Sequence, residues 1–440
     1  MKNFASIGVQ VPDIVLPNKN IDYQKWAVIA CDQFTSQPEY WEDVEKFVEN
    51  SPSTLNLILP EVFLEKKDID KRIEKSLQNM MAYSKNGVFN TFEGFILVER
   101  HVSGKTRHGL MLALDLEKYD FNKGSQTLIR ATEGTIIERL PPRIKIRENA
   151  SLEFPHILVL IDDPKKSVIE PIIAGKNELT LLYDFDLMKD SGHIKGFAVD
   201  SLEQELKVIN ALENLAEKEG FYRKYGLSVK DHFDVILFAM GDGNHSLATA
   251  KAIWEKNKNK VGMDHPSRYA LVEIENIHDE GLEFEPIHRV VFNLKCDPLE
   301  AMKDHWDDAF EIQTNLTKKE MIYLVDSKME NQHKFGFIFN NAISVISITK
   351  PECNLAVGEL QRFLDQWVCL PNAEKIDYVH GADITVELGN RPGNCGFYLP
   401  PMEKNDLFKT VIIDGALPRK TFSMGEAKEK RFYLEGRKII

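Results

Sequence analysis

Residues 231–255 read DHFDVILFAMGDGNHSLATAKAIWE and carry the strongest indication of the fold. The apolar run VILFAM at 235–240 predicts a buried strand, because short continuous apolar runs are typical of strands covered on both faces. The loop GDGNHS follows, and Leu247, Ala250 and Trp254 then recur at helical intervals. The stretch therefore predicts a strand that passes through a glycine loop into a helix.

Further elements of both kinds flank this stretch. Apolar runs that predict strands lie at 95–98, 110–114, 157–161 and 270–274. Amphipathic repeats that predict helices begin after Ser36, Asp68 and Ser201. Because strands that alternate with helices are typical of α/β proteins, we predict an α/β body over residues 1–293.

After Asn293 the pattern changes. A helix-like segment, DPLEAMKDHWDDAF, precedes the alternating stretches KFGFIFNN and AISVISI, which predict two paired strands. This pattern indicates a smaller α+β second domain over residues 294–410. The remaining residues, 411–440, are rich in cations and glycine, and we expect them to fold back onto the first body.

The composition excludes several classes of function. The 440 residues include 55 Lys and Arg against 68 Asp and Glu, a net charge of −13, which argues against general nucleic-acid binding. No apolar run approaches the roughly 18 to 20 residues that span a bilayer, so no membrane partner is expected. The five cysteines form no CxxC pair. We therefore expect neither zinc nor haem, and we expect a cytoplasmic protein.

The loop between the predicted strand and helix has the composition of an anion site. A helix N-terminus offers backbone N–H groups and a positive dipole end, and glycine lets the backbone approach a phosphate closely. We predict that His245 donates to the phosphate in catalysis, and that Asp242 orients His245 or holds a metal. The residues predicted to bind phosphate are Gly241, Gly243, Asn244 and Ser246. The alternative is a tight turn in which Asp or Asn caps the helix.

A cationic island, IRATEGTIIERLPPRIKIRE, lies upstream at 129–148. Between its first and last arginines it holds five cations and two acids. We predict that Arg130, Arg139 and Arg143 bind phosphate and that Glu133 is the general base. The alternation in RIKIR predicts an extended strand with three cations on one face. The alternatives are a solvated edge strand for RIKIR and a structural ion pair for Glu133.

Two further segments carry candidate ligand-binding residues. PHILVLIDDP ends a predicted strand with Asp162, a candidate Mg²⁺ ligand, although Asp-Asp-Pro is also typical of a turn. Residues 418–438 hold seven cations and three acids. We predict that this second island meets the first around an anion, with Arg419 binding phosphate at the rim of the Asp242 loop. An ordinary surface position is the alternative for each.

The segments GDGNHSLATA, RATEGTIIERLPPR, PHILVLIDDP, FEPIHR and LPRKTFSMGEAKEKRFYLE together resemble the domain of unknown function family 1015 over nearly the whole chain. The strand-loop-helix also resembles the signature of the wider ParB and sulfiredoxin superfamily, whose distant members include free serine kinases. That resemblance implies a ParB/sulfiredoxin-like α/β body in which Asp242, Gly243 and His245 hold nucleotide phosphates. Ser246 stands where the wider pattern has arginine, and Thr132 stands where many family members have histidine before the glutamate.

From these residues we predict an enzyme that binds a nucleotide or another phosphorylated small molecule and transfers or cleaves its phosphoryl group. Phosphoryl transfer depends on positioning and charge neutralisation, for which a glycine loop, arginines and acids are suited. The implied ligand is ATP or ADP with Mg²⁺. The alternative is a non-catalytic sensor that binds a phosphorylated small molecule and signals through its second domain.

Overall fold

The computed structural model divides the chain into two compact units. Unit 1 comprises Met1–Leu282 and Gly425–Ile440, and unit 2 comprises Glu283–Met424. The residues that the structure describes are 2–35, 37–134, 140–327, 331–369, 372–425 and 427–440. The sequence patterns place the boundaries at 293 and 410 instead. β16 (Phe284–Phe292) belongs to unit 2 because it pairs there with β20 (Lys375–His380) and β21 (Cys395–Tyr398).

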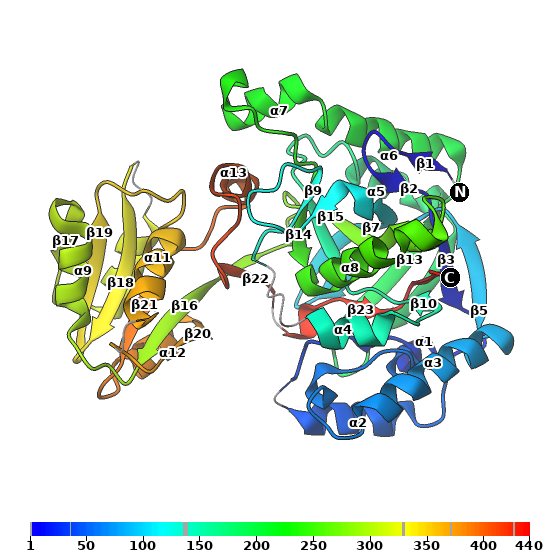
Figure 1. Cartoon of the computed structure of the whole chain (residues 1–440), viewed down its shortest axis with the longest axis horizontal. Coiled ribbons are helices and arrows are strands. Elements are labelled where there is room, and N and C mark those ends of the chain that lie inside the picture. The colour runs from blue at the N-terminus through cyan, green and yellow to red at the C-terminus, as the bar shows by residue number, and fades with distance from the viewer. Residues whose placement is uncertain (1, 36, 135–139, 328–330, 370–371, 426) are drawn as a thin grey trace. The chain divides into compact units, whose positions relative to one another are not determined.

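Unit 1 is built on a large mixed sheet (Figure 1). In spatial order its strands are β12 (Leu181–Asp186), β13 (His193–Val199), β6 (Phe95–Val102), β7 (Lys105–Asp115), β15 (Tyr269–Asn276), β11 (Leu158–Ile161), β14 (Phe238–Asp242), β9 (Ile129–Arg130) and β8 (Tyr119–Asp120). β2 (Val9–Gln10) pairs with β7, and β1 (Asn3–Phe4) pairs with β2. The apolar runs of the sequence all contribute to this sheet, so the predicted α/β class is confirmed.

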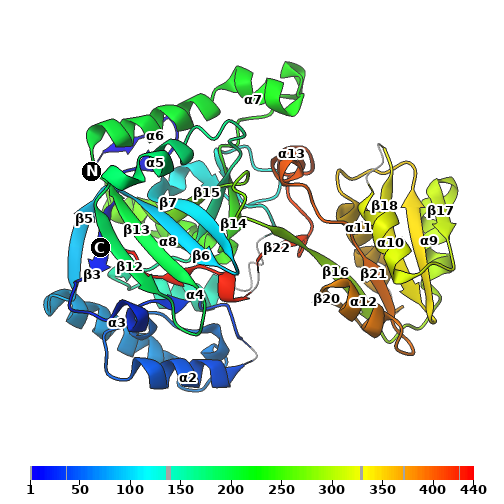
Figure 2. The ribbon, with the colours of Figure 1, turned by 180° about the vertical axis from the view of Figure 1, so that it is seen from behind.

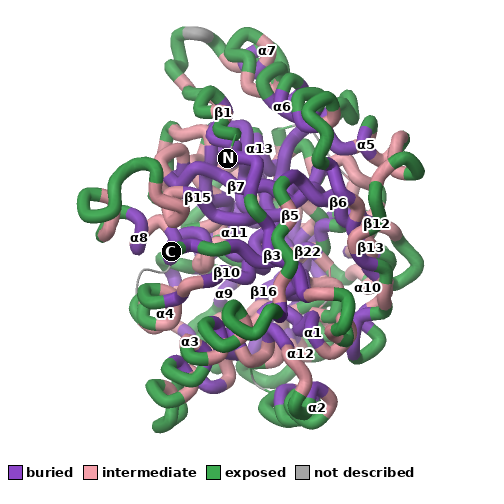
Figure 3. Tube along the Cα trace, turned by 90° about the vertical axis from the view of Figure 1, so that its right-hand side faces the viewer, coloured by how far each residue is buried: buried purple, intermediate pink, exposed green. Residues whose placement is uncertain are grey.

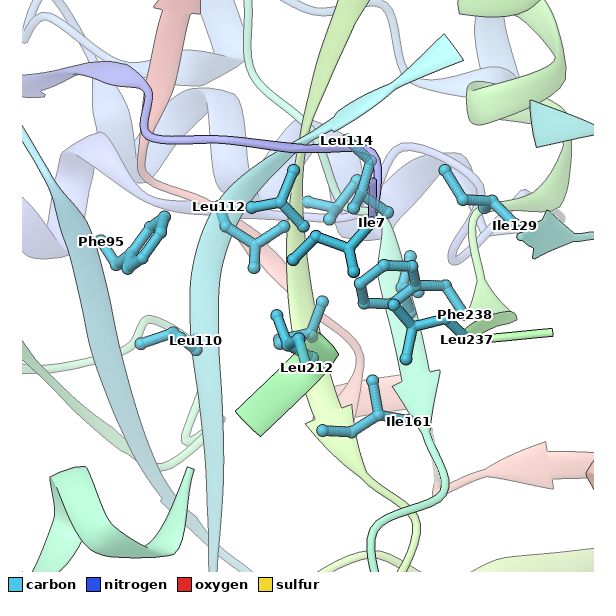
Figure 4. Packing of buried hydrophobic residues seen from close by; sticks show 14 of the residues in the cluster. Ile7, Phe95, Leu110, Leu112, Leu114, Ile129, Ile161, Leu212, Leu237 and Phe238 are labelled. Atoms are coloured by element: carbon cyan, nitrogen blue, oxygen red, sulfur yellow. The ribbon is translucent and has the colours of Figure 1, made fainter. Parts of the chain in front are cut away.

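Side chains alternate between the two faces of this sheet, as the period of a strand requires. On β6, Phe95 and Leu97 enter one core, and Ile96 and Val98 enter the other. The first core, part of which Figure 4 shows, is completed by α5 (Glu170–Ala174), α6 (Leu202–Leu215) and α8 (Asn244–Val261). The second is completed by α2 (Pro38–Val48) and α3 (Ile69–Lys85). Figure 2 shows α6 and α2 on opposite sides of the strands, and Figure 3 shows the strands buried between such layers.

Residues 425–440 rejoin unit 1 after the whole of unit 2. The strand β23 (Phe432–Tyr433) pairs with β4 (Val28–Ile29). The strands of a second small sheet are, in order, β10 (Leu152–Glu153), β24 (Gly436–Lys438), β3 (Asp13–Pro17) and β5 (Phe89–Glu93). The C-terminal segment is therefore an internal part of the body, not a surface tail.

Buried charges hold this C-terminal segment against the central sheet. The Arg100 guanidinium donates to backbone carbonyls of residues 428–430. Arg431 pairs with Glu435 at 2.6 Å and with Glu273 at 3.3 Å. All four charged side chains are buried. Because a buried charge that loses its partner is strongly destabilising, these contacts fix the segment in place.

Unit 2 has an antiparallel sheet of its own. In spatial order its strands are β17 (Phe310–Gln313), β19 (Ala342–Ile348), β18 (His333–Phe339), β21, β16 and β20, with β22 (Phe422–Met424) beside β16. Its helices are α9 (Pro298–Trp306), α10 (Lys318–Asp326), α11 (Ala356–Cys369), α12 (Ala382–Gly389) and α13 (Lys404–Asp414). The hairpin of β18 and β19 is the pair of alternating stretches that the sequence predicts.

One local prediction is wrong. The RIKIR residues lie in a helix, α4 (Leu140–Arg147), and not in an extended strand. Pro141 and Pro142 fix φ near its helical value in the first turn, where the missing N–H groups cost nothing. The helix also packs against α8, a tertiary contact that five alternating residues cannot reveal.

Across the described ranges, no helix has both the length and the apolar character that crossing a membrane requires. The remaining helices of unit 1 are α1 (Tyr23–Trp26) and α7 (Lys218–Tyr225).

Candidate functional site

The predicted strand-loop-helix is confirmed. β14 ends at Asp242 and α8 begins at Asn244, with Gly243 between them at φ +78°. A Cβ at this glycine would lie 3.1 Å from the Ile157 Cα, so the turn packs directly on the start of β11. Glycine is required here both by the left-handed backbone and by this close approach.

The amides of this loop are not all available to an anion. The Gly243 amide donates to Asp242 Oδ1 at 2.8 Å, and the Ser246 amide donates to the Gly243 carbonyl at 2.9 Å. The predicted phosphate contact from the Ser246 backbone is therefore not favoured, because the first turn of α8 already uses that donor. Asn244 Oδ1 is buried and has no hydrogen-bond partner among the described residues. A polar atom in this state is unusual and is consistent with a site that awaits a donor.

Asp242 forms an ion pair with a cation from the C-terminal segment. The distance from Lys430 Nζ to Asp242 Oδ2 is 3.2 Å, and the side chains are 13% and 22% exposed. Burial alone would raise the pKa of Asp242. The Lys430 ammonium has the largest of the effects that outweigh burial and hold this pKa below its ordinary value, and the Gly243 amide adds to it.

His156 lies beside this pair, in the loop that leads into β11. Its Nδ1 is 2.8 Å from the Tyr433 hydroxyl, and its Nε2 is 3.7 Å from Asp32 Oδ2. The Tyr433 hydroxyl also accepts a hydrogen bond from the Cys31 amide at 3.2 Å. Four separate chain segments thus place titratable groups around the start of α8.

A cavity of about 140 Å³ opens next to these groups, wholly within unit 1. Most of its lining is apolar, and the apolar residues include Leu57, Leu59, Met80, Ile146, Leu152 and Phe154. Its polar lining consists of Cys31, Glu61, Arg143, Arg147, Glu153, His156, Ser246, Thr249 and Tyr433. An apolar chamber with a few convergent polar groups is the usual form of a small-molecule site.

The predicted arginines do not lie together. Arg143 lines the cavity with Ser246, where it forms an ion pair with Glu61. Arg130 is buried and donates to the carbonyls of Thr127 at 2.8 Å and Asp234 at 2.6 Å, so its guanidinium joins two loops, and its phosphate role stays a prediction. Arg139 lies outside the described residues. Arg419 belongs to unit 2, where it donates to Asp365 at 2.6 Å.

Two predicted acids lie away from the cavity lining. Asp162 receives hydrogen bonds from Tyr225 and His278, both at 2.7 Å, and pairs with Lys224 at 2.9 Å. These donors occupy its carboxylate, so the structure does not favour the Mg²⁺ role. Among the described residues, no group of three or more His, Cys, Asp or Glu could hold a metal. Glu133 is partly exposed, and its role as the base stays a prediction.

The sequence patterns did not single out His156, Lys430, Tyr433 or Asp32. They come from three different segments, and no short spacing joins any of them to Asp242. The available signal was indirect, because three of these residues fall inside the segments PHILVLIDDP and LPRKTFSMGEAKEKRFYLE that resemble a known family.

The Asp242–Lys430 pair predicts a pH-dependent loss of stability. Because the folded pKa of Asp242 is depressed, its contribution is present above the ordinary carboxyl pKa of about 3.9 and is lost as the pH falls through the folded value. Lys430→Met should lower the free energy of unfolding by about 1–3 kcal/mol at pH 7. The difference from the unmodified protein should shrink to nothing in acid.

Urea unfolding between pH 7 and pH 3 measures this difference. The control is Lys207→Met, which removes an exposed pair with Glu203 at 2.7 Å and should change stability by less than about 1 kcal/mol. A Lys430→Met effect that stays constant across this pH range would contradict the assignment.

Comparisons with known proteins give one family and several remote structural similarities. The model of a family described as "Protein of unknown function (DUF1015)" matches residues 15–367. No curated protein matches the chain. A conserved hypothetical protein from Pyrococcus furiosus aligns with a TM-score of 0.34 and 12% identity, covering 74% of this chain and 90% of that chain. A free serine kinase in complex with AMP aligns with a TM-score of 0.37 and 10% identity, covering 75% and 91%.

Proposed function

The chain belongs to the DUF1015 family of proteins of unknown function, and we propose that unit 1 binds a small phosphorylated molecule in the cavity beside the start of α8. One observation carries this proposal: the cavity is apolar along most of its lining and brings Arg143, His156 and Ser246 together. Such a chamber suits a ligand with an apolar body and one anionic group.

The size of the cavity limits the ligand. At roughly 10–15 Å³ for each water position, a volume of about 140 Å³ holds on the order of ten water molecules. This is the size of a small metabolite or of one part of a nucleotide. We propose ATP and ADP as the first ligands to test, with Mg²⁺ supplied together with the nucleotide.

The proposed reaction is phosphoryl transfer or phosphate hydrolysis. In it, His245 and Asp242 act at the helix start, Gly243 and Asn244 approach the phosphate, and Glu133 is the general base. We also propose that this strand-loop-helix is related to the ParB and sulfiredoxin signature. The alternative is a non-catalytic sensor, which the existence of a second compact unit favours. Long incubation of the protein with ATP and Mg²⁺ separates the two, because a sensor binds ligand without forming product.

The Arg143–Glu61 pair allows a test with two substitutions that should change ligand affinity in opposite directions. Arg143→Gln removes a charged donor and should weaken binding by about 10- to 100-fold, since such a hydrogen bond contributes about 1.5–3 kcal/mol. Glu61→Gln removes the carboxylate that competes with the ligand for this arginine, and it should strengthen binding. Isothermal titration with ATP, ADP and inorganic phosphate at pH 7 measures both changes.

Arg72→Gln is the matched control, because Arg72 pairs with Asp68 at 2.9 Å on the surface of α3. Its affinity for each ligand should equal that of the unmodified protein. If none of the three ligands binds, the proposed ligand class is wrong. If Arg143→Gln and Glu61→Gln shift the affinity in the same direction, the anion does not meet Arg143.

A further inference from the structure

Two neighbours, the Cys31 amide and the His156 ring, determine the hydrogen bonds of the Tyr433 hydroxyl. Its oxygen accepts from the Cys31 amide at 3.2 Å, and His156 Nδ1 lies 2.8 Å away. Burial, together with Cys31, raises the pKa of Tyr433 far above its ordinary value, so the phenol keeps its proton. That proton needs an acceptor, because a buried hydroxyl without one is costly.

The imidazole nitrogen is the better of two acceptors. The Cys31 thiol also lies against the hydroxyl, but sulfur is a weak acceptor, whereas an unprotonated imidazole nitrogen at 2.8 Å is a strong one. The phenol therefore donates to His156 Nδ1. Because Nδ1 accepts, the ring proton resides on Nε2.

The other ring nitrogen, Nε2, then carries the proton that the ring can donate. The nearest carboxylate oxygen recorded for it, Asp32 Oδ2, is 3.7 Å away, beyond hydrogen-bond distance. His156 itself lines the cavity, and its side chain is only 6% exposed. Because His156 belongs to the cavity lining, its Nε2–H group can donate to the oxygen of a ligand bound there.

We propose that Tyr433 is a positioning residue that fixes His156 as its Nε2–H tautomer, so that His156 donates a hydrogen bond to an anionic oxygen of the ligand in the cavity. The hydrogen bond from His156 to the ligand rests on the proposed function, whereas the assignment of the tautomer does not. The interaction that forms is a hydrogen bond from the Nε2–H group to the ligand oxygen, and no covalent bond is made or broken. In this role Tyr433 acts through His156.

Nitrogen NMR of the ligand-free protein tests the tautomer directly. The protein is labelled with ¹⁵N-histidine, and the signals of His156 among the twelve histidines are assigned by their loss in His156→Gln. We expect a protonated Nε2 and an unprotonated Nδ1 at neutral pH. A protonated Nδ1, alone or together with Nε2, overturns the proposal whatever the ligand proves to be.

Tyr433→Phe tests the positioning. Loss of the hydroxyl should move the His156 ring signals toward a mixture of tautomers and weaken binding of inorganic phosphate or ADP by about tenfold. Tyr222→Phe is the matched control, because the Tyr222 hydroxyl is also buried with its ring and donates to the Phe233 carbonyl at 2.7 Å. It should leave both readouts unchanged.

If the tautomer is as expected but no phosphate compound binds, the proposed function fails and the tautomer assignment stands. If Tyr433→Phe leaves the His156 signals unchanged, the positioning role is overturned.

Discussion

Replacing Arg100 with methionine should lower the free energy of unfolding by about 3–5 kcal/mol, because it removes several hydrogen bonds from a buried charged donor, each of which contributes about 1.5–3 kcal/mol. The guanidinium is 3% exposed and donates to the carbonyls of Lys428 at 2.7 Å, Glu429 at 3.1 Å and Ser191 at 3.2 Å. Methionine fills much of the same volume but offers no donor. These three carbonyls, and that of Lys430, would then lose their charged donor.

The measurement is urea unfolding at pH 7, with Arg72→Met as the control. Arg72 is partly exposed, pairs with Asp68 and lies 4.0 Å from the centroid of the Phe63 ring, so the same chemical change there should cost at most about 1–2 kcal/mol. Arg100→Met should also weaken phosphate or ADP binding, because the backbone that carries Lys430 loses its anchor. Equal effects of the two substitutions on stability would show that the buried network does not hold the C-terminal segment.

The second large effect is expected for Gly243→Ala. The left-handed backbone costs an alanine about 1–2 kcal/mol. The new Cβ would also lie 3.1 Å from the Ile157 Cα, and forcing extra volume into a packed position typically costs a further 1–3 kcal/mol, or about 2–5 kcal/mol in all. Displacement of the loop should reduce phosphate or ADP affinity by at least about 100-fold, since misplacements near 1 Å have effects of that size.

Gly226 supplies a matched control. It also has a left-handed backbone, with φ +64°, but a Cβ there meets nothing within 4 Å. Gly226→Ala should therefore show the backbone cost alone and no change in binding. Thermal unfolding and phosphate titration of both variants measure the difference. If the two variants lose equal stability, the close approach to Ile157 is unimportant.

Local patterns were sufficient where a single segment determines the structure. The capped start of α6 is an example, because the Ser201 side chain accepts from the Gln204 amide at 3.2 Å, both within one turn. The strands β6, β7 and β15 were predicted because each contains a short run of consecutive apolar residues. The RIKIR residues were misassigned because their helix depends on packing against α8, which lies about a hundred positions away in the sequence.

The candidate site was predicted only in part for the same reason. The Asp242 loop was found because the strand, glycines and helix follow one another directly. Its partners could not be found in this way, because His156 and Lys430 approach Asp242 only after the sheet has formed and the C-terminal segment has paired with β3 and β4. Arg143 was found from local charge, but its pairing with Glu61 joins residues 82 positions apart.

The insertion of unit 2 within unit 1 has a consequence for synthesis. A ribosome completes residues 1–282 and then all of unit 2 before it adds residues 425–440, which include Lys430 and Tyr433. Until these residues emerge, β3 and β4 lack the pairing partners that β24 and β23 supply. Products truncated in unit 2 should remain in that state, and the candidate site therefore forms only after translation has passed residue 433.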